Sequence, residues 1–84
     1  MNITLNKHMN NFQSFQALNL SIYWSYETPI AFYINGVLTI RKNEWSSTTG
    51  KHLDFIDKDH KKRIDGKDFL KAFNSIVIAP KKHV

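Results

Sequence analysis

The pair Asn35-Gly36 constrains the fold most, because it stands between two apolar runs at residues 29–34 and 37–42. Asn-Gly readily adopts positive φ at both central positions of a type I′ turn, whose twist matches that of two antiparallel strands. We therefore predict a β-hairpin. The predicted pairs are Ile34 with Val37, Tyr33 with Leu38, Phe32 with Thr39 and Ala31 with Ile40. Apolar residues on both faces place this hairpin centrally in the sheet.

An alternating pattern over residues 18–26 predicts a preceding strand. Leu20, Ile22 and Trp24 share the face expected to be buried, whereas Tyr23 and Ser25 share the face expected to be exposed. Pro29 then predicts a turn or the start of an edge strand. The Asn- and Gln-rich segment 1–16 is poorly defined, and only residues 2–6 alternate enough to suggest a short strand.

The period changes after the hairpin and predicts a helix over residues 48–57, with Ser47 or Thr48 as its cap. This helix would place Thr49, His52, Leu53 and Ile56 on one side.

A second helix is expected to open at residues 65–68, with Asp65 as its cap and Phe69, Ala72 and Phe73 as its apolar stripe. Residues 76–78 are β-branched or apolar and suggest a short edge strand. Residues 80–84 look like a basic tail.

These elements predict a single α+β domain over residues 1–84. We expect a small antiparallel sheet of three to four strands around the Asn-Gly hairpin, with two short helices covering one face. Hydrophobic residues make up 42% of the chain, which is enough for a folded core. The chain has no cysteine and shows neither a leader nor an apolar membrane span, so we expect a soluble protein of the cytoplasm, without disulfides.

Charge is unevenly distributed along the chain. Residues 1–40 contain one lysine (Lys7) and one glutamate (Glu27), whereas residues 41–84 contain 11 Lys or Arg and 6 Asp or Glu. A basic half attracts polyanions such as nucleic acid or an acidic protein surface. It also serves simply as a solvated surface that keeps the protein soluble, so charge alone leaves both interpretations open.

The segment 45–53 gathers hydroxyl groups, a lysine and a histidine at the start of a predicted helix. Unpaired N–H groups at a helix N-terminus favour phosphate or carboxylate. The alternative is a structural one, in which a hydroxyl caps the helix, His52 packs on the sheet and Lys51 is solvated. The candidate residues for anion or nucleic-acid binding are Thr48, Thr49, Lys51, His52, Lys61, Lys62 and Arg63.

Metal binding and catalysis are disfavoured by the sequence. Residues 57–68 align partly with a calcium-binding EF-hand loop, but Lys61 replaces an oxygen ligand and Lys62 replaces the glycine of the sharp turn. The four histidines are dispersed, without zinc-binding spacing. No catalytic constellation or cofactor motif is recognisable, so we expect no catalytic, metal or cofactor residues and no enzyme.

Two motifs carry a family resemblance. The first is Ser25-Tyr26-Glu27-Thr28-Pro29-Ile30-Ala31, and the second runs from Ser46 to Leu53, with the Asn-Gly hairpin between them. This pattern resembles a family of short, uncharacterised proteins encoded largely by bacteriophages and prophages. Gly50 departs from it, because a larger or hydroxyl residue is expected there.

The resemblance implies a small accessory protein expressed by a phage in the bacterial host cytoplasm. We expect a non-enzymatic protein that binds a host protein or ribonucleoprotein complex, with inhibition of a bacterial defence system, as in anti-CRISPR proteins, as one form of this role. The alternative is a nucleic-acid-binding accessory protein that uses the basic half. The sequence leaves a monomer or a homodimer open, because an exposed hairpin edge can pair across a two-fold axis.

Overall fold

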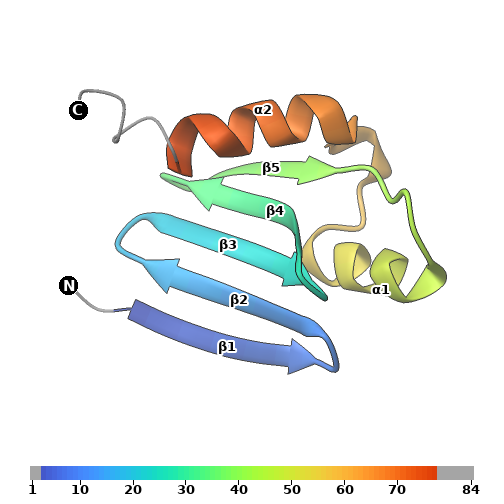
Figure 1. Cartoon of the computed structure of the whole chain (residues 1–84), viewed down its shortest axis with the longest axis horizontal. Helices are drawn as coiled ribbons and strands as arrows, with labels where there is room; N and C mark the ends of the chain where they lie inside the picture. Colours follow the sequence, from blue (N-terminus) through green and yellow to red (C-terminus); the bar gives the residue numbers. More distant parts are fainter. Residues whose placement is uncertain (1–2, 78–84) are drawn as a thin grey trace.

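The chain passes up and down through five consecutive antiparallel strands before its helices begin (Figure 1). The computed structural model describes residues 3–77. The strands are β1 (Ile3–Met9), β2 (Phe12–Ala17), β3 (Leu20–Ser25), β4 (Thr28–Ile34) and β5 (Val37–Arg41). The elements that follow are α1 (Ser47–Ile56), the 3₁₀ helix η1 (His60–Lys62), β6 (Arg63–Ile64) and α2 (Gly66–Val77).

The architecture is α+β, as predicted, but the sheet has six strands in the order β1 to β6. The last strand pairs in parallel with β5, so the sheet is mixed rather than antiparallel. The short strand predicted over residues 2–6 is confirmed as part of β1. The strands β2 and β6 escaped prediction for different reasons. Residues 1–16 contain β1 and most of β2, whose polar Asn, Gln and Ser residues obscure the alternation. The strand β6 has two residues, too few to show a period.

The predicted hairpin is confirmed in register and in turn geometry. All four expected pairs of β4 and β5 form, from Ile34 with Val37 to Ala31 with Ile40. The turn residues Asn35 and Gly36 both have positive φ, 52° and 79°. The strand β4 lies between β3 and β5, which places the hairpin inside the sheet.

A β-bulge in β4 explains how Pro29 fits within a paired strand. Tyr23 pairs with Ala31 and Trp24 pairs with Pro29, so Ile30 is the extra residue. Proline cannot donate a ladder hydrogen bond, and a bulge is one of the places where a sheet tolerates it. Both Ile30 and Ala31 are completely buried in the same cluster, so the bulge adds one apolar side chain to that core.

The two helices cover opposite faces of the sheet, which corrects the prediction that both lie on one face. Leu53 of α1 belongs to the same cluster as Tyr23, whereas Phe69 of α2 packs in a second cluster with Ile22. Adjacent residues of a strand point to opposite faces. The face expected to be exposed is therefore covered by α1, and Tyr23 is half-buried rather than exposed.

The helix α1 confirms its predicted position within one residue and its predicted buried side, Thr49, His52 and Leu53. Its cap differs from the prediction: Ser46 is the N-cap, and its side chain makes no capping hydrogen bond.

The helix α2 buries Phe69 and packs Ala72, Phe73 and Ile76 around the same cluster. This spacing of three, four and seven residues continues the helical stripe, so Ile76 is helical rather than part of the predicted edge strand. Ile78 and the basic tail 80–84 lie outside the described residues.

Candidate functional site

A hollow of about 290 Å³ lies beside the N-terminal end of α1. One wall comes from the β3–β4 hairpin and the other from the segment that leads into α1. The lining residues are Ser25, Tyr26, Thr28 and Ile30 on the first wall, and Trp45, Ser46 and Thr49 on the second. The fold therefore brings together the two motifs that carry the family resemblance, although they are separated by the whole Asn-Gly hairpin.

A chain of buried hydrogen bonds joins the two walls of this hollow. Ser25 Oγ lies 2.7 Å from Nδ1 of His52 and 3.1 Å from Oγ1 of Thr49. All three residues are at most 3% exposed, so water cannot replace these bonds. A strand end and two successive turns of α1 are thereby fixed relative to one another.

Burial favours the neutral form of the His52 imidazole. Burial lowers the pKa of His52 below its ordinary value of 6.5, and a hydrogen bond to the backbone of Asn10 offsets part of this shift. With one ring nitrogen donating to that backbone, Nδ1 is the acceptor and Ser25 is the donor. The ring also stacks on Phe12 of β2, with centroids 4.7 Å apart and planes 7° apart.

Tyr26 forms the rim of the hollow in an unusual backbone conformation. Its φ is +57°, a left-handed value that bulky side chains rarely adopt, and its N–H donates to the Asn11 carbonyl over 2.6 Å. The side chain is 51% exposed. A residue that occupies this conformation costs about 1–2 kcal/mol relative to right-handed backbone, a cost that glycine avoids.

Trp45 forms the opposite rim and is 48% exposed. The guanidinium of Arg41 lies over its ring at 4.6 Å from the centroid and over Phe69 at 5.4 Å. Arg41 is 5% exposed and pairs with Glu44 at 3.4 Å. Gly66 permits this placement, since a Cβ there would lie 2.1 Å from Arg41 Nη2. The position of Trp45 is thus coupled to the start of α2.

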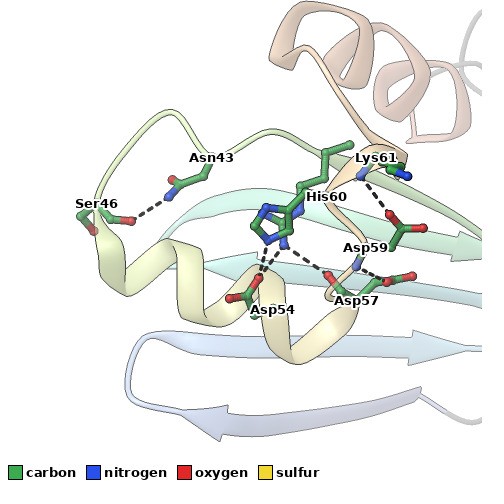
Figure 2. A network of polar contacts seen from close by, with 8 residues as sticks. Asn43, Ser46, Asp54, Asp57, Asp59, His60 and Lys61 are labelled. Carbon is green, nitrogen blue, oxygen red and sulfur yellow. Dashed lines mark hydrogen bonds and ion pairs between the residues drawn. The ribbon is translucent and has the colours of Figure 1, made fainter.

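A second polar network joins α1 to the segment that follows it (Figure 2). Asp54 accepts from His60 Nε2 at 3.0 Å and from Arg63 Nη2 at 2.8 Å, and these hydrogen bonds hold the pKa of Asp54 below its ordinary value of 3.8. Figure 2 shows His60 and Asp54 pointing toward one another.

In the part of this segment that resembles a calcium-binding loop, the carboxylates accept hydrogen bonds from backbone N–H groups of the same segment. Asp57 accepts from the N–H of Asp59, and Asp59 accepts from the N–H of Lys61. Asp57 also pairs with Lys62 Nζ at 3.0 Å. The two carboxylates therefore stabilise the turn into η1, and among residues 3–77 no group of three or more potential metal ligands gathers.

The predicted anion-binding residues do not form one surface. Thr49 and His52 are buried in the chain of hydrogen bonds described above, as in the structural alternative that the sequence left open, and Thr49 also lines the hollow. The side chain of Arg63 is 7% exposed and pairs with Asp54. The remaining candidates, Thr48, Lys51, Lys61 and Lys62, are exposed.

Comparison with known families identifies the relatives of this chain. The model of a family of unknown function, DUF8033, matches residues 2–72. The chain belongs to the DUF8033 family. The match includes both walls of the hollow and the first part of α2, whereas no curated protein and no solved structure matches the chain. The association of DUF8033 with phages stays a prediction.

Of the seven residues that line the hollow in this DUF8033 chain, only Thr49 was among the predicted site residues; Ser25, Tyr26 and Trp45 were missed, as were Thr28, Ile30 and Ser46. Ser25 and Tyr26 belong to the first resemblance motif, and that motif was the available signal. The role of Ser25 was missed because strand alternation placed it on the face expected to be exposed, whereas the structure buries it. No helix among the described residues is long and apolar enough to cross a membrane.

Proposed function

We propose that this protein is a non-enzymatic, phage-type accessory protein that binds a host macromolecule in the bacterial cytoplasm, with Tyr26 and Trp45 as its anchors. The observation that carries the proposal is the placement of two half-exposed aromatic side chains on opposite rims of one hollow. Trp and Tyr are the residue types most enriched among those that dominate binding energy at protein interfaces.

The backbone of Tyr26 supports the same proposal. Glycine or asparagine would occupy this left-handed turn position with less strain, as Asn11 and Asn35 do in two of the other hairpin turns. A tyrosine there places an aromatic ring beside the hollow at a cost to stability. The buried chain from Thr49 through Ser25 to His52 holds both walls in place, so the rims are organised before a partner binds.

The charge of the chain favours an acidic protein surface as the partner. The formal net charge is +5, and Lys51, Lys58, Lys61 and Lys67 are all exposed. Complementary charge raises the association rate more than it raises affinity. Inhibition of a bacterial defence complex, as anti-CRISPR proteins do, fits a small basic binder of this kind.

Affinity capture from bacterial host lysate, with and without nuclease, tests the proposal. We expect wild-type protein to retain one stoichiometric host protein after nuclease treatment, and purified partner to bind it directly. Trp45→Ala and Tyr26→Ala should each weaken the direct binding at least tenfold. Val37→Ala, at a position that is 68% exposed and outside the hollow, should leave binding unchanged. Equal binding by all four proteins would refute the role of the hollow.

Nucleic-acid binding is the alternative function. The exposure of Lys51 and Lys61, which are available to contact phosphates, supports this alternative. Phosphate contacts make log K fall with log salt at a slope of roughly −0.7 to −0.9 per contact. Capture that is lost on nuclease treatment, together with a slope that decreases in Lys51→Ala/Lys61→Ala, would favour this alternative over a protein partner.

The non-enzymatic part of the proposal has its own test, because Ser25 and His52 have the separation of a nucleophile and a base. Ser25 is 2% exposed, so we expect no labelling by a fluorophosphonate probe. Labelling of wild-type protein that disappears in Ser25→Ala would show a reactive serine and refute a purely binding role.

A further inference from the structure

The strand β1 forms one border of the sheet, as Figure 1 shows. It pairs with β2 on one side, and within residues 3–77 no strand pairs with its other side. The backbone N–H and C=O groups on that outer side are therefore available to another strand. An edge of this kind is a template for pairing with a further chain.

The first part of β1 lacks the features that usually protect an edge. Proteins discourage edge pairing with proline, charged side chains or a β-bulge. The strand contains no proline, its one lysine is Lys7, and its register shift lies between Lys7 and Met9. The lysine and the register shift both lie at the C-terminal end of β1, so the stretch before Lys7 is regular and uncharged.

The part of β1 before Lys7 also has an exposed apolar side chain, next to an apolar residue of β2. Leu5 is 74% exposed and pairs with Phe15 of β2, whose own neighbour on β3 is Ile22. Ile22 belongs to the cluster under α2, so Leu5 and Phe15 lie on the α2 face of the sheet. Figure 1 shows α2 beside β4 and β5, away from β1. The apolar face therefore continues beyond the helix that covers it, out to the edge.

Charge selects a second copy of this chain as the partner of the edge. Residues 1–40 carry one lysine and one glutamate, whereas the net charge of +5 resides in residues 41–84. Two copies that meet through β1 would bring their uncharged borders together and keep their basic halves at the two ends. An interface formed by residues 41–84 would instead oppose two basic surfaces.

We propose that two copies of the protein pair through β1 in antiparallel orientation, with Leu5 opposite Leu5, so that their sheets join into one. In this register Lys7 lies opposite the partner's Ile3. The two Lys7 residues are then four positions apart along the strand, about 13 Å at 3.3 Å per residue. This separation exceeds the Debye length of roughly 8 Å at physiological salt, so their repulsion is largely screened. The proposal does not depend on the hollow beside α1.

The absence of cysteine from the chain makes the register directly testable. Directly opposite strand residues have Cα atoms about 4.5–5.5 Å apart, within the range that a disulfide spans. We expect Leu5→Cys to form a covalent dimer under mild oxidation. Lys7→Cys, on the same strand, should not, because its copies lie too far apart. Val37→Cys is the exposed control away from β1.

The mass of the wild-type protein in solution, measured by sedimentation at micromolar to millimolar concentration, tests the dimer itself. We expect twice the chain mass for wild type and the monomer mass for Leu5→Lys, with an unchanged circular dichroism spectrum because Leu5 is exposed. If the wild-type protein stays a monomer throughout this range, the proposal is overturned. This outcome covers the case in which a strand of a host protein, rather than a second copy, pairs with β1. Equal cross-linking of Leu5→Cys and Lys7→Cys would refute the proposed register. A Leu5→Lys variant that is still a dimer would refute β1 as the dimer interface.

Discussion

Replacing Ser25 by alanine tests whether the buried chain of hydrogen bonds holds the two walls of the hollow together. The substitution removes the donor to His52 Nδ1, 2.7 Å away, and one partner of Thr49, 3.1 Å away. His52 is 1% exposed, so its ring nitrogen would be left without water or protein as a partner. An unsatisfied buried polar group costs about 1–3 kcal/mol. Two groups lose a partner, so with about 1–1.5 kcal/mol for each, the lower part of this range, we expect a loss of about 2–3 kcal/mol.

Thermal unfolding followed by circular dichroism measures this loss. For a domain of this size, 1 kcal/mol corresponds to a shift in Tm of roughly 4–8 °C, so Ser25→Ala should lower Tm by roughly 8–24 °C. Thr49→Val should cost less, about 1 kcal/mol, because Ser25 still donates to His52. The double variant should then lose less than the sum of the two single losses, since both remove parts of one network.

Ser75→Ala is the matched control for Ser25→Ala. Ser75 Oγ donates to the Ala72 carbonyl at 2.8 Å, nearly the same length, but on the exposed side of α2. Water replaces this bond, so the change in stability should stay within about 0.5 kcal/mol. If Ser25→Ala lowered Tm by no more than Ser75→Ala does, burial would not increase the contribution of the Ser25 hydrogen bond to stability, and the reasoning would be refuted.

Three further predictions concern pH, a turn and the core. Burial lowers the pKa of His52 below 6.5, so below that pH the unfolded chain binds a proton that the folded chain does not bind. The free energy of unfolding should therefore fall as pH drops below 6.5. In urea titrations between pH 6.5 and 3.8, the free energy of unfolding of His52→Gln should depend less on pH than that of the wild type. Leu18 has φ +55° and is 82% exposed, so Leu18→Asn should raise Tm by about 2–4 °C, for a gain of about 0.5 kcal/mol; no gain would refute the strain argument. Phe69 is completely buried between α2 and the sheet, so Phe69→Ala should lower the free energy of unfolding, measured by urea titration followed by circular dichroism, by about 3–5 kcal/mol, whereas a change below 1 kcal/mol would contradict its place in the core.

Local chemistry was enough to predict several parts of the fold. The Asn-Gly turn determines its own backbone conformation, and the side-chain period of two then fixes every pair of the hairpin. The helical spacing of Thr49, His52 and Leu53 likewise identified the buried side of α1. These features depend on residues that are neighbours along the chain.

The strand β2 and its hairpin with β1 were missed because strands near the border of a sheet need little apolar alternation, and only the short strand at residues 2–6 was predicted in this region. The pairing of β2 depends on backbone hydrogen bonds to β3, and the side chains that it exposes can be polar, as Gln13 and Gln16 are. The assignment of the helices to one face failed for a related reason. The sequence shows that each helix has an apolar side, but only the connection between α1 and α2 through β6 decides which face each one covers.

For the site, the sequence by itself determined the two motifs, the basic second half and the absence of thiol chemistry. It named Thr49, His52 and Arg63 as candidates for anion binding, although the helical spacing also placed Thr49 and His52 on the inward side of the helix. The tertiary structure decided otherwise, since the β3–β4 hairpin lies against α1 and Asp54 lies against Arg63. A polar side chain becomes a structural contact or a binding group according to what lies opposite it. Residues distant along the chain supply that surface, and only the folded chain brings them together.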